Sequence, residues 1–279
     1  MPNVPYPPQR PLSVGEVLDL SFRIYRATLV KCLLWAACGV LAGQLANIYT
    51  LARGRPLARG SWDVLLAQIR DPAVGTLYFV GGVVTAVFYA AVLLRQRTMI
   101  ADHAVGGEVA AALRRVPALI GLGLLLIGAC LACFVPALVT GGALRALLVL
   151  AALITLCYGA VAVSCAQTVL LVDGAGPVSS VSRSVRLTSG SFWRLSAIYT
   201  VALVILFALY AVTAAIAGFL AGVLGRGDFA LVTAFAGVVG IALGALATPF
   251  YGALALAVLA DLKVRKEGAD LEQRISATA

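Results

Sequence analysis

The hydrophobic positions of the chain gather into long apolar runs, separated by short segments rich in Arg, Gly and Pro. An α-helix rises 1.5 Å per residue, so about 20 apolar residues are needed to cross a hydrocarbon core about 30 Å thick. Six runs meet this requirement, at about residues 28–51, 73–94, 117–139, 146–172, 195–224 and 229–260. The pattern therefore predicts an all-α integral membrane protein with six transmembrane helices.

An amphipathic pattern precedes the first, third and fifth runs. It is clear in PLSVGEVLDLSFRIYR, where Ser13 and Glu16 fit a capping box, and in GPVSSVSRSVRLTSGSFWR, and it is fainter in GGEVAAALRRVPALI. A helix of this kind lies in the membrane interface rather than across the membrane. The sequence thus predicts three helical hairpins, each preceded by a cytoplasmic interfacial amphipathic helix, in repeat units of about 12–94, 105–172 and 176–260.

Two of these lead-in segments share an order of residue types that favours an internal repeat. In FRIYRATLVKCL and VRLTSGSFWRL, Arg23 corresponds to Arg186 and Lys31 corresponds to Arg194. The alternative is that any cytoplasmic approach to a transmembrane helix tends to be basic and amphipathic, without common descent.

Composition leaves little room for a soluble domain. The chain has 279 residues, of which 62% are hydrophobic and 12% charged, whereas soluble domains carry about 25% charged residues. We therefore expect a flexible N-terminal tail (1–11), a single membrane domain (12–260) and a cytoplasmic C-terminal tail (261–279). Within that tail, the charges of DLKVRKEGADLE either pair with arginines of the lead-in helices or are solvated.

The distribution of cations predicts the orientation. If both termini are cytoplasmic, 15 of the 21 Lys and Arg residues lie on the inner side, as the positive-inside rule requires. The net charge of +9 then reflects loops that face an anionic leaflet. It requires no nucleic-acid partner.

Eight cations near the inner ends of the helices are expected to form a basic girdle that holds an anionic lipid headgroup or an acidic partner. They are Arg23, Arg26, Lys31, Arg95, Arg97, Arg183, Arg186 and Arg194. The alternative is that these residues only set the topology.

Polar residues inside the predicted spans form two pairs, each one helical turn apart: Gln44 with Asn47, and Ser164 with Gln167. Hydrogen bonds between helices explain such pairs, and a polar path for a substrate is the alternative. No Asp, Glu, Lys or Arg lies in the middle of a predicted span. This absence disfavours an ion-coupled transporter, because such proteins retain buried charges for function.

Three segments carry a resemblance to a known family. RPLSVGEVLDLSFRIYR, DGAGPVSSVSRSVRLTSGSFWRL and DLKVRKEGADLE, in this order, resemble the membrane domain of some bacterial glycerophosphoryl diester phosphodiesterases, which also occurs as a stand-alone protein. The resemblance covers nearly the whole chain and implies a helical protein of the bacterial cytoplasmic membrane. It carries no catalytic residue over, because the enzymatic half of that family is a separate soluble barrel.

Catalytic chemistry is not indicated by the residues. The chain has one histidine, His103, without the cluster of ligands that a metal requires. We therefore expect no catalytic residue, no metal and no cofactor. The sequence favours a non-enzymatic scaffold or subunit that binds lipids, a protein partner or a second copy of itself through its cytoplasmic face. The alternative is a transporter or a lipid- or peptide-translocating protein.

The orientation generates the first prediction. Cysteine introduced as Ser61→Cys should react with an impermeant thiol reagent in intact cells, because the loop between the first two spans is expected outside. Ser182→Cys should react only after permeabilisation. The opposite labelling pattern would reverse the predicted orientation.

Overall fold

The computed structural model describes residues 6–8, 10–53, 70–101, 106–224 and 229–268, and in these residues the chain is helical. The helices are α1 (Val14–Gly43), α2 (Leu45–Ala52), α4 (Pro72–Ile100), α5 (Glu108–Arg114), α6 (Val116–Leu138), α7 (Gly142–Ala162), α8 (Ala166–Val172), α9 (Pro177–Thr188), α10 (Phe192–Leu224) and α11 (Phe229–Glu267). Within the described ranges, six helical segments are long and apolar enough to cross a membrane: α1, α4, α6, α7 with α8, α10, and α11. The prediction of an all-α membrane protein with six such helices is confirmed.

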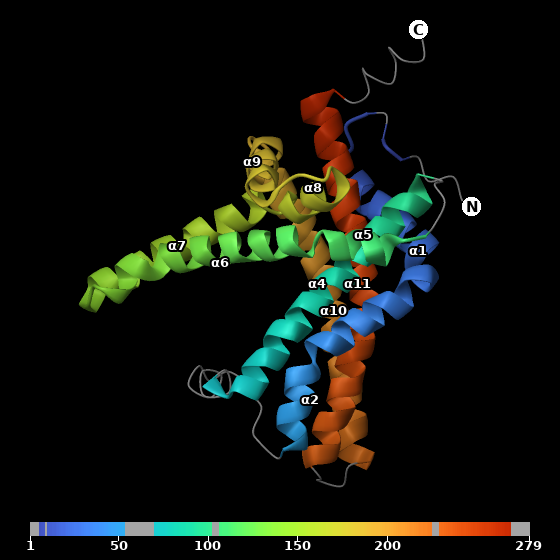
Figure 1. Cartoon of the computed structure of the whole chain (residues 1–279), viewed down its shortest axis with the longest axis vertical. Helices are drawn as coiled ribbons and strands as arrows, with labels where there is room; N and C mark the ends of the chain where they lie inside the picture. The colour runs from blue at the N-terminus through green and yellow to red at the C-terminus, as the bar shows by residue number, and fades with distance from the viewer. Residues whose placement is uncertain (1–5, 9, 54–69, 102–105, 225–228, 269–279) are drawn as a thin grey trace.

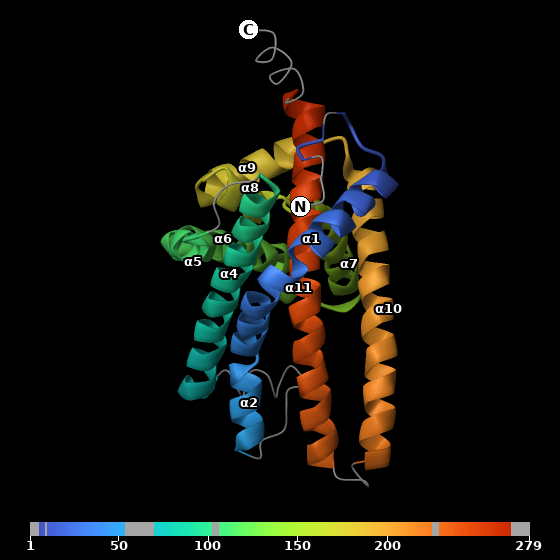
Figure 2. The ribbon, with the colours of Figure 1, turned by 90° about the vertical axis from the view of Figure 1, so that its right-hand side faces the viewer.

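Helix α11 is the centre of the fold (Figures 1 and 2). Helices α1, α4 and α10 pack against it, and its residues from Leu243 to Val264 are largely buried. The ring of Phe250 lies 5.0 Å from that of Phe22 and 5.8 Å from that of Tyr25, so aromatic contacts join α11 to the beginning of α1.

Helices α6 and α7 pack against each other and project to one side, across the direction of α10 and α11 (Figures 1 and 2). Most of their apolar surface is exposed, including Leu131 and Ile154, each 63% exposed. The six long helices therefore do not share one direction in this structure.

The first lead-in segment is not a separate interfacial helix, contrary to the prediction. Helix α1 runs without interruption from Val14 to Gly43, and the predicted capping box of Ser13 and Glu16 is present at its start. No Gly or Pro lies between Glu16 and Thr28 to interrupt the helix. The hydroxyls of Ser21 and Thr28 bond back to the carbonyls of Val17 and Ile24, which satisfies them inside a continuous helix.

Breaks occur elsewhere, inside segments that were predicted to be continuous. The first predicted span is interrupted at Gln44, between α1 and α2, and the fourth at residues 163–165, between α7 and α8. A further break, at Arg115, separates α5 from α6 and lies between the fainter lead-in segment and the third predicted span. Pro117 accounts for that break, because it has no backbone N–H for the carbonyl one turn earlier and disfavours helical geometry at the residue before it.

Helix α9 is a separate helix, and its inward face carries hydroxyl groups rather than Val178 and Val185. Val178 and Val185 are 68% and 44% exposed, whereas Ser184 and Thr188 are buried. Both buried hydroxyls donate to the carbonyl of Ala162, at 2.8 and 3.1 Å. Helix α9 therefore packs its hydroxyl-bearing face against the break between α7 and α8.

A buried amide joins the three central helices. Gln96 of α4 is fully buried, and its Nε2 donates to Oγ1 of Thr28 in α1 at 3.1 Å and to the carbonyl of Pro249 in α11 at 2.8 Å. Gly252, one turn after Pro249, allows this approach, because a Cβ there would collide with Oε1 of Gln96. A single polar side chain thus sets the spacing of α1, α4 and α11.

The second prediction follows from this contact. Gly252→Ala should destabilise the protein by about 1–3 kcal/mol, because the added methyl group enters a filled space. Gly240→Ala, on the same helix, meets no neighbour within 4 Å and should leave the melting temperature unchanged or slightly higher. Thermal unfolding of the purified proteins in detergent measures both, and equal melting temperatures would contradict this role for Gly252.

Candidate functional site

Polar contacts concentrate in one region where five segments meet. These segments are the beginning of α1, the α8–α9 loop, helix α9, the beginning of α10 and the end of α11. We call this region the polar end. Its centre is Asp261 of α11, whose side chain is 1% exposed. One carboxylate oxygen lies 2.6 Å from NH1 of Arg194 in α10. The other accepts the backbone N–H of Leu12 at 2.8 Å.

The peptide group of Leu12 is enclosed from both sides. Its carbonyl accepts hydrogen bonds from Arg194 at 2.8 Å and from Arg265 at 2.6 Å, while its N–H bonds to Asp261. Arg265 also bonds to Asp261 at 3.2 Å, one turn earlier on α11. The three segments that carry the family resemblance therefore converge on one ionic cluster.

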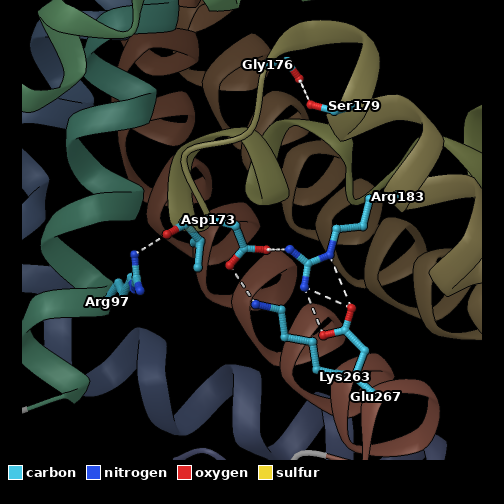
Figure 3. Close-up of polar contacts among 8 residues, drawn as sticks. Arg97, Asp173, Gly176, Ser179, Arg183, Lys263 and Glu267 are labelled. Carbon is cyan, nitrogen blue, oxygen red and sulfur yellow. Dashed lines mark hydrogen bonds and ion pairs between the residues drawn. The ribbon is translucent and has the colours of Figure 1, made fainter.

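A second cluster lies beside the first and is centred on Asp173, at the end of α8 (Figure 3). The Asp173 carboxylate lies 2.7 Å from Nζ of Lys263 and 3.0 Å from NH1 of Arg183. Arg183 in turn donates to both carboxylate oxygens of Glu267, at 2.8 and 2.9 Å. These hydrogen bonds raise the pKa of the Arg183 guanidinium, so it stays charged. The cluster fixes α9 to the last turn of α11.

Two further arginines bind backbone carbonyls of the α8–α9 loop. Arg97 of α4 donates to the carbonyl of Val172 at 2.5 Å (Figure 3), and Arg115 donates to that of Gly174 at 2.9 Å. Gly174 has a φ of +71°, which glycine adopts without strain. A Cβ at this position would also lie 2.6 Å from the Arg115 guanidinium. Glycine is therefore required here on both counts.

An open pocket of about 420 Å³ lies between α9 and the end of α11. Its polar lining is Ser182, Arg186, Ser189, Lys266 and Glu267. Glu267 is already bound by Arg183. Neither Arg186 nor Lys266 forms an ion pair with any residue that the structure describes. The pocket therefore carries uncompensated positive charge.

The predicted girdle of eight cations is not continuous. Arg183 and Arg194 bind carboxylates of α11, and Arg97 binds a carbonyl. Arg95 lies over the ring of Trp35, with its guanidinium carbon 4.6 Å from the ring centre, and Arg23 pairs with Asp19. The remaining three are exposed: Arg26, Lys31 and Arg186. Of the eight, Arg186 lines the pocket.

The charged terminal segment is not a solvated tail up to residue 267. Helix α11 continues past residue 260 to Glu267, and its charges pair with arginines of α9 and α10. Gly268 follows with a φ of +63°, typical of the residue that ends a helix. The expected N-terminal tail also makes contact, because Tyr6 packs against the core around α1 and α11. Burial raises the pKa of Tyr6 to about 12.

Sequence reasoning did not name Asp173, although that residue carries a signal, and it named Lys266 only among the charges of DLKVRKEGADLE. Asp173 ends an apolar run and begins the turn DGAG. It therefore lies at a predicted helix end, where the last backbone carbonyls need hydrogen-bond donors from elsewhere. His103, the one histidine, lies outside the described residues.

The two predicted intramembrane pairs have different surroundings. Asn47 donates to Gln44 at 2.8 Å and accepts from the hydroxyl of Tyr78 at 3.0 Å, so this pair joins α2 to α4. Ser164 lies 3.9 Å from Sγ of Cys165, within the break between α7 and α8. Gln167 lines a separate cavity. The four residues therefore do not line one path.

No family model, curated protein or solved structure matches this chain. The resemblance to the phosphodiesterase membrane domain stays a prediction, and function must be argued from geometry.

The third prediction concerns the buried carboxylate. Asp261→Asn should lower the unfolding free energy by about 3 kcal/mol or more, because it leaves the guanidinium of Arg194 without its counter-charge. Asp19→Asn is a matched control, because Asp19 pairs with Arg23 with both side chains more than half exposed. It should cost less than about 1 kcal/mol. Chemical denaturation in detergent measures both variants, and a similar cost for the two would show that Asp261 does not hold the polar end together.

Proposed function

We propose that this protein is a non-enzymatic, multi-pass membrane scaffold or subunit that binds the headgroup of an anionic phospholipid at its polar end. The single observation that carries the proposal is the pocket between α9 and α11. Arg186 and Lys266 line it, and neither has an acidic partner among the described residues. Two unneutralised cations in one pocket favour an anionic ligand.

The position of α9 supports a lipid as that ligand. Helix α9 lies across the direction of α11 (Figure 2), as a helix in the membrane interface does. Its exposed Val178 and Val185 suit the edge of the hydrocarbon, and Trp193, 84% exposed, follows at the start of α10. Tryptophan side chains favour the headgroup level of a bilayer. The pocket would then open where phosphates lie.

The chemistry of the lining supports a phosphate group. A guanidinium donates two parallel hydrogen bonds to phosphate oxygens, and Lys adds a mobile point charge. The hydroxyls of Ser182 and Ser189 are further donors at the same pocket. Each cation near an anionic surface contributes about 1 kcal/mol.

The proposal that the protein is not an enzyme rests on how its acidic groups are used. Asp173, Asp261 and Glu267 are engaged by cations, so none is free to act as a general base at the pocket. We further propose that the polar end faces the cytoplasm of a bacterium, with both termini on that side, because it gathers most of the basic residues of the helix ends. An acidic segment of a protein partner is the other occupant that this charge would suit.

The fourth prediction tests the pocket. Arg186→Gln/Lys266→Gln should reduce the retention of phosphatidylglycerol by roughly thirtyfold in native mass spectrometry, since two cations of about 1 kcal/mol each are removed. The control is Arg53→Gln/Arg145→Gln, which neutralises two exposed arginines away from the pocket. The control should retain the lipid as the wild type does.

Equal retention by the two double variants would contradict the lipid proposal. If lipid retention is equal and a co-purifying protein is lost only from Arg186→Gln/Lys266→Gln, the pocket belongs to an acidic partner instead. Inorganic phosphate, added in competition, separates a site for any phosphate from one that also requires the lipid chains.

A further inference from the structure

A partly open cavity between the helices contains polar side chains that the contacts described so far do not explain. It has a volume of about 290 Å³ and lies between α1, α4, α8 and α11. Its polar lining is Thr85, Tyr89, Gln167 and Thr248. Two of these are satisfied, because Thr85 donates to the carbonyl of Gly39 and Thr248 to that of Gly244, both at 2.8 Å.

The other two polar side chains make no hydrogen bond within the described parts of the chain. These are the amide of Gln167 and the hydroxyl of Tyr89. Both side chains are partly exposed, and in the hydrocarbon of a bilayer, which offers no water, a polar group costs free energy unless a partner satisfies it. An amide and a phenol each offer both a donor and an acceptor. The group that best complements both is an uncharged hydroxyl.

An apolar groove adjoins this cavity. It has a volume of about 330 Å³, lies between α4 and α6, and is lined by apolar residues apart from Tyr78. Gly82 and Ala86 of α4 line both spaces. Both spaces therefore border the same short stretch of α4, where Gly82 has no side chain and a Cβ would meet nothing within 4 Å. Together the volumes fall within the range of about 300–1,000 Å³ that is typical of small-molecule sites.

We propose that the cavity and the groove together bind an uncharged, single-chain amphiphile, with its hydroxyl at Gln167 and Tyr89 and its hydrocarbon chain between α4 and α6. No charged side chain lines either space in the described residues, so an ionised headgroup would be buried without a counter-charge. This ligand differs from the anionic headgroup proposed for the polar end, and the two sites have no residue in common.

The fifth prediction uses two photoreactive probes, a diazirine-bearing octanol and the same diazirine-bearing chain without the hydroxyl. With the full chain in phosphatidylcholine vesicles, the alcohol should label α4 and α8 around the cavity more than the hydrocarbon does. In Tyr89→Phe/Gln167→Met, which preserves volume, that preference should fall roughly tenfold, the scale of two modest hydrogen bonds. Tyr158→Phe, an exposed tyrosine of α7, is the control and should keep the preference.

A second pair of variants tests the groove. A Cβ at Gly82 meets nothing within 4 Å, so Gly82→Leu should place its side chain in the space that borders α4 and reduce labelling by both probes several-fold. Gly128→Leu, on α6, also has open space around it and should have no effect. Gel filtration and melting temperature establish that each variant is folded. Equal labelling by the two probes in the wild type, or unchanged labelling in the cavity variants, would overturn the proposal and leave a cavity that holds only water.

Discussion

A backbone carbonyl that is left open where a helix breaks or ends needs a hydrogen-bond donor from elsewhere. Much of this structure follows from that constraint. Side chains from distant segments supply the donors: Ser184 and Thr188 to Ala162, Arg97 to Val172, and Arg115 to Gly174. Each donor joins two segments that are between 22 and 75 residues apart in sequence. The breaks therefore determine which helices pack together.

The same requirement decides what the cations do. Lys and Arg near helix ends set the topology of a membrane protein, but here several are also structural. Arg194 and Arg265 bind the carbonyl of Leu12, and Arg183 bridges Asp173 and Glu267. Cations used in this way are unavailable to a ligand. Arg186 and Lys266 stand out because the charged residues beside them, Arg183 and Glu267, are already paired with each other. The specific arrangement therefore matters more than the net charge of +9.

The coarse fold could be predicted because it depends on properties that a single segment carries. Length and hydropathy identify the six long helices, and the order Ser13 to Glu16 identifies the start of α1. The breaks and the buried polar contacts could not be predicted, because each depends on a partner elsewhere. Gln96 reads as one polar residue near a helix end, and only the fold places it against Thr28 and Pro249. Arg186 could be named from sequence, whereas its pairing with Lys266 in one pocket required the structure.

Helices α6 and α7 connect to the rest of the chain through two helix breaks, at Arg115 and at residues 163–165. No continuous helix therefore links this pair to its neighbours in the chain. A rigid-body swing of this pair would pivot at both points. Among the described residues, Arg115 bonds to Gly174, the α9 hydroxyls bond to Ala162, and Tyr158 of α7 stacks on Phe192 of α10, and these contacts would resist such a movement. Helix α9 is bound to α11 through the ion pair of Arg183 and Glu267. A ligand that altered this ion pair would shift α9, and through α9 it would change the angle between the α6–α7 pair and the rest of the protein.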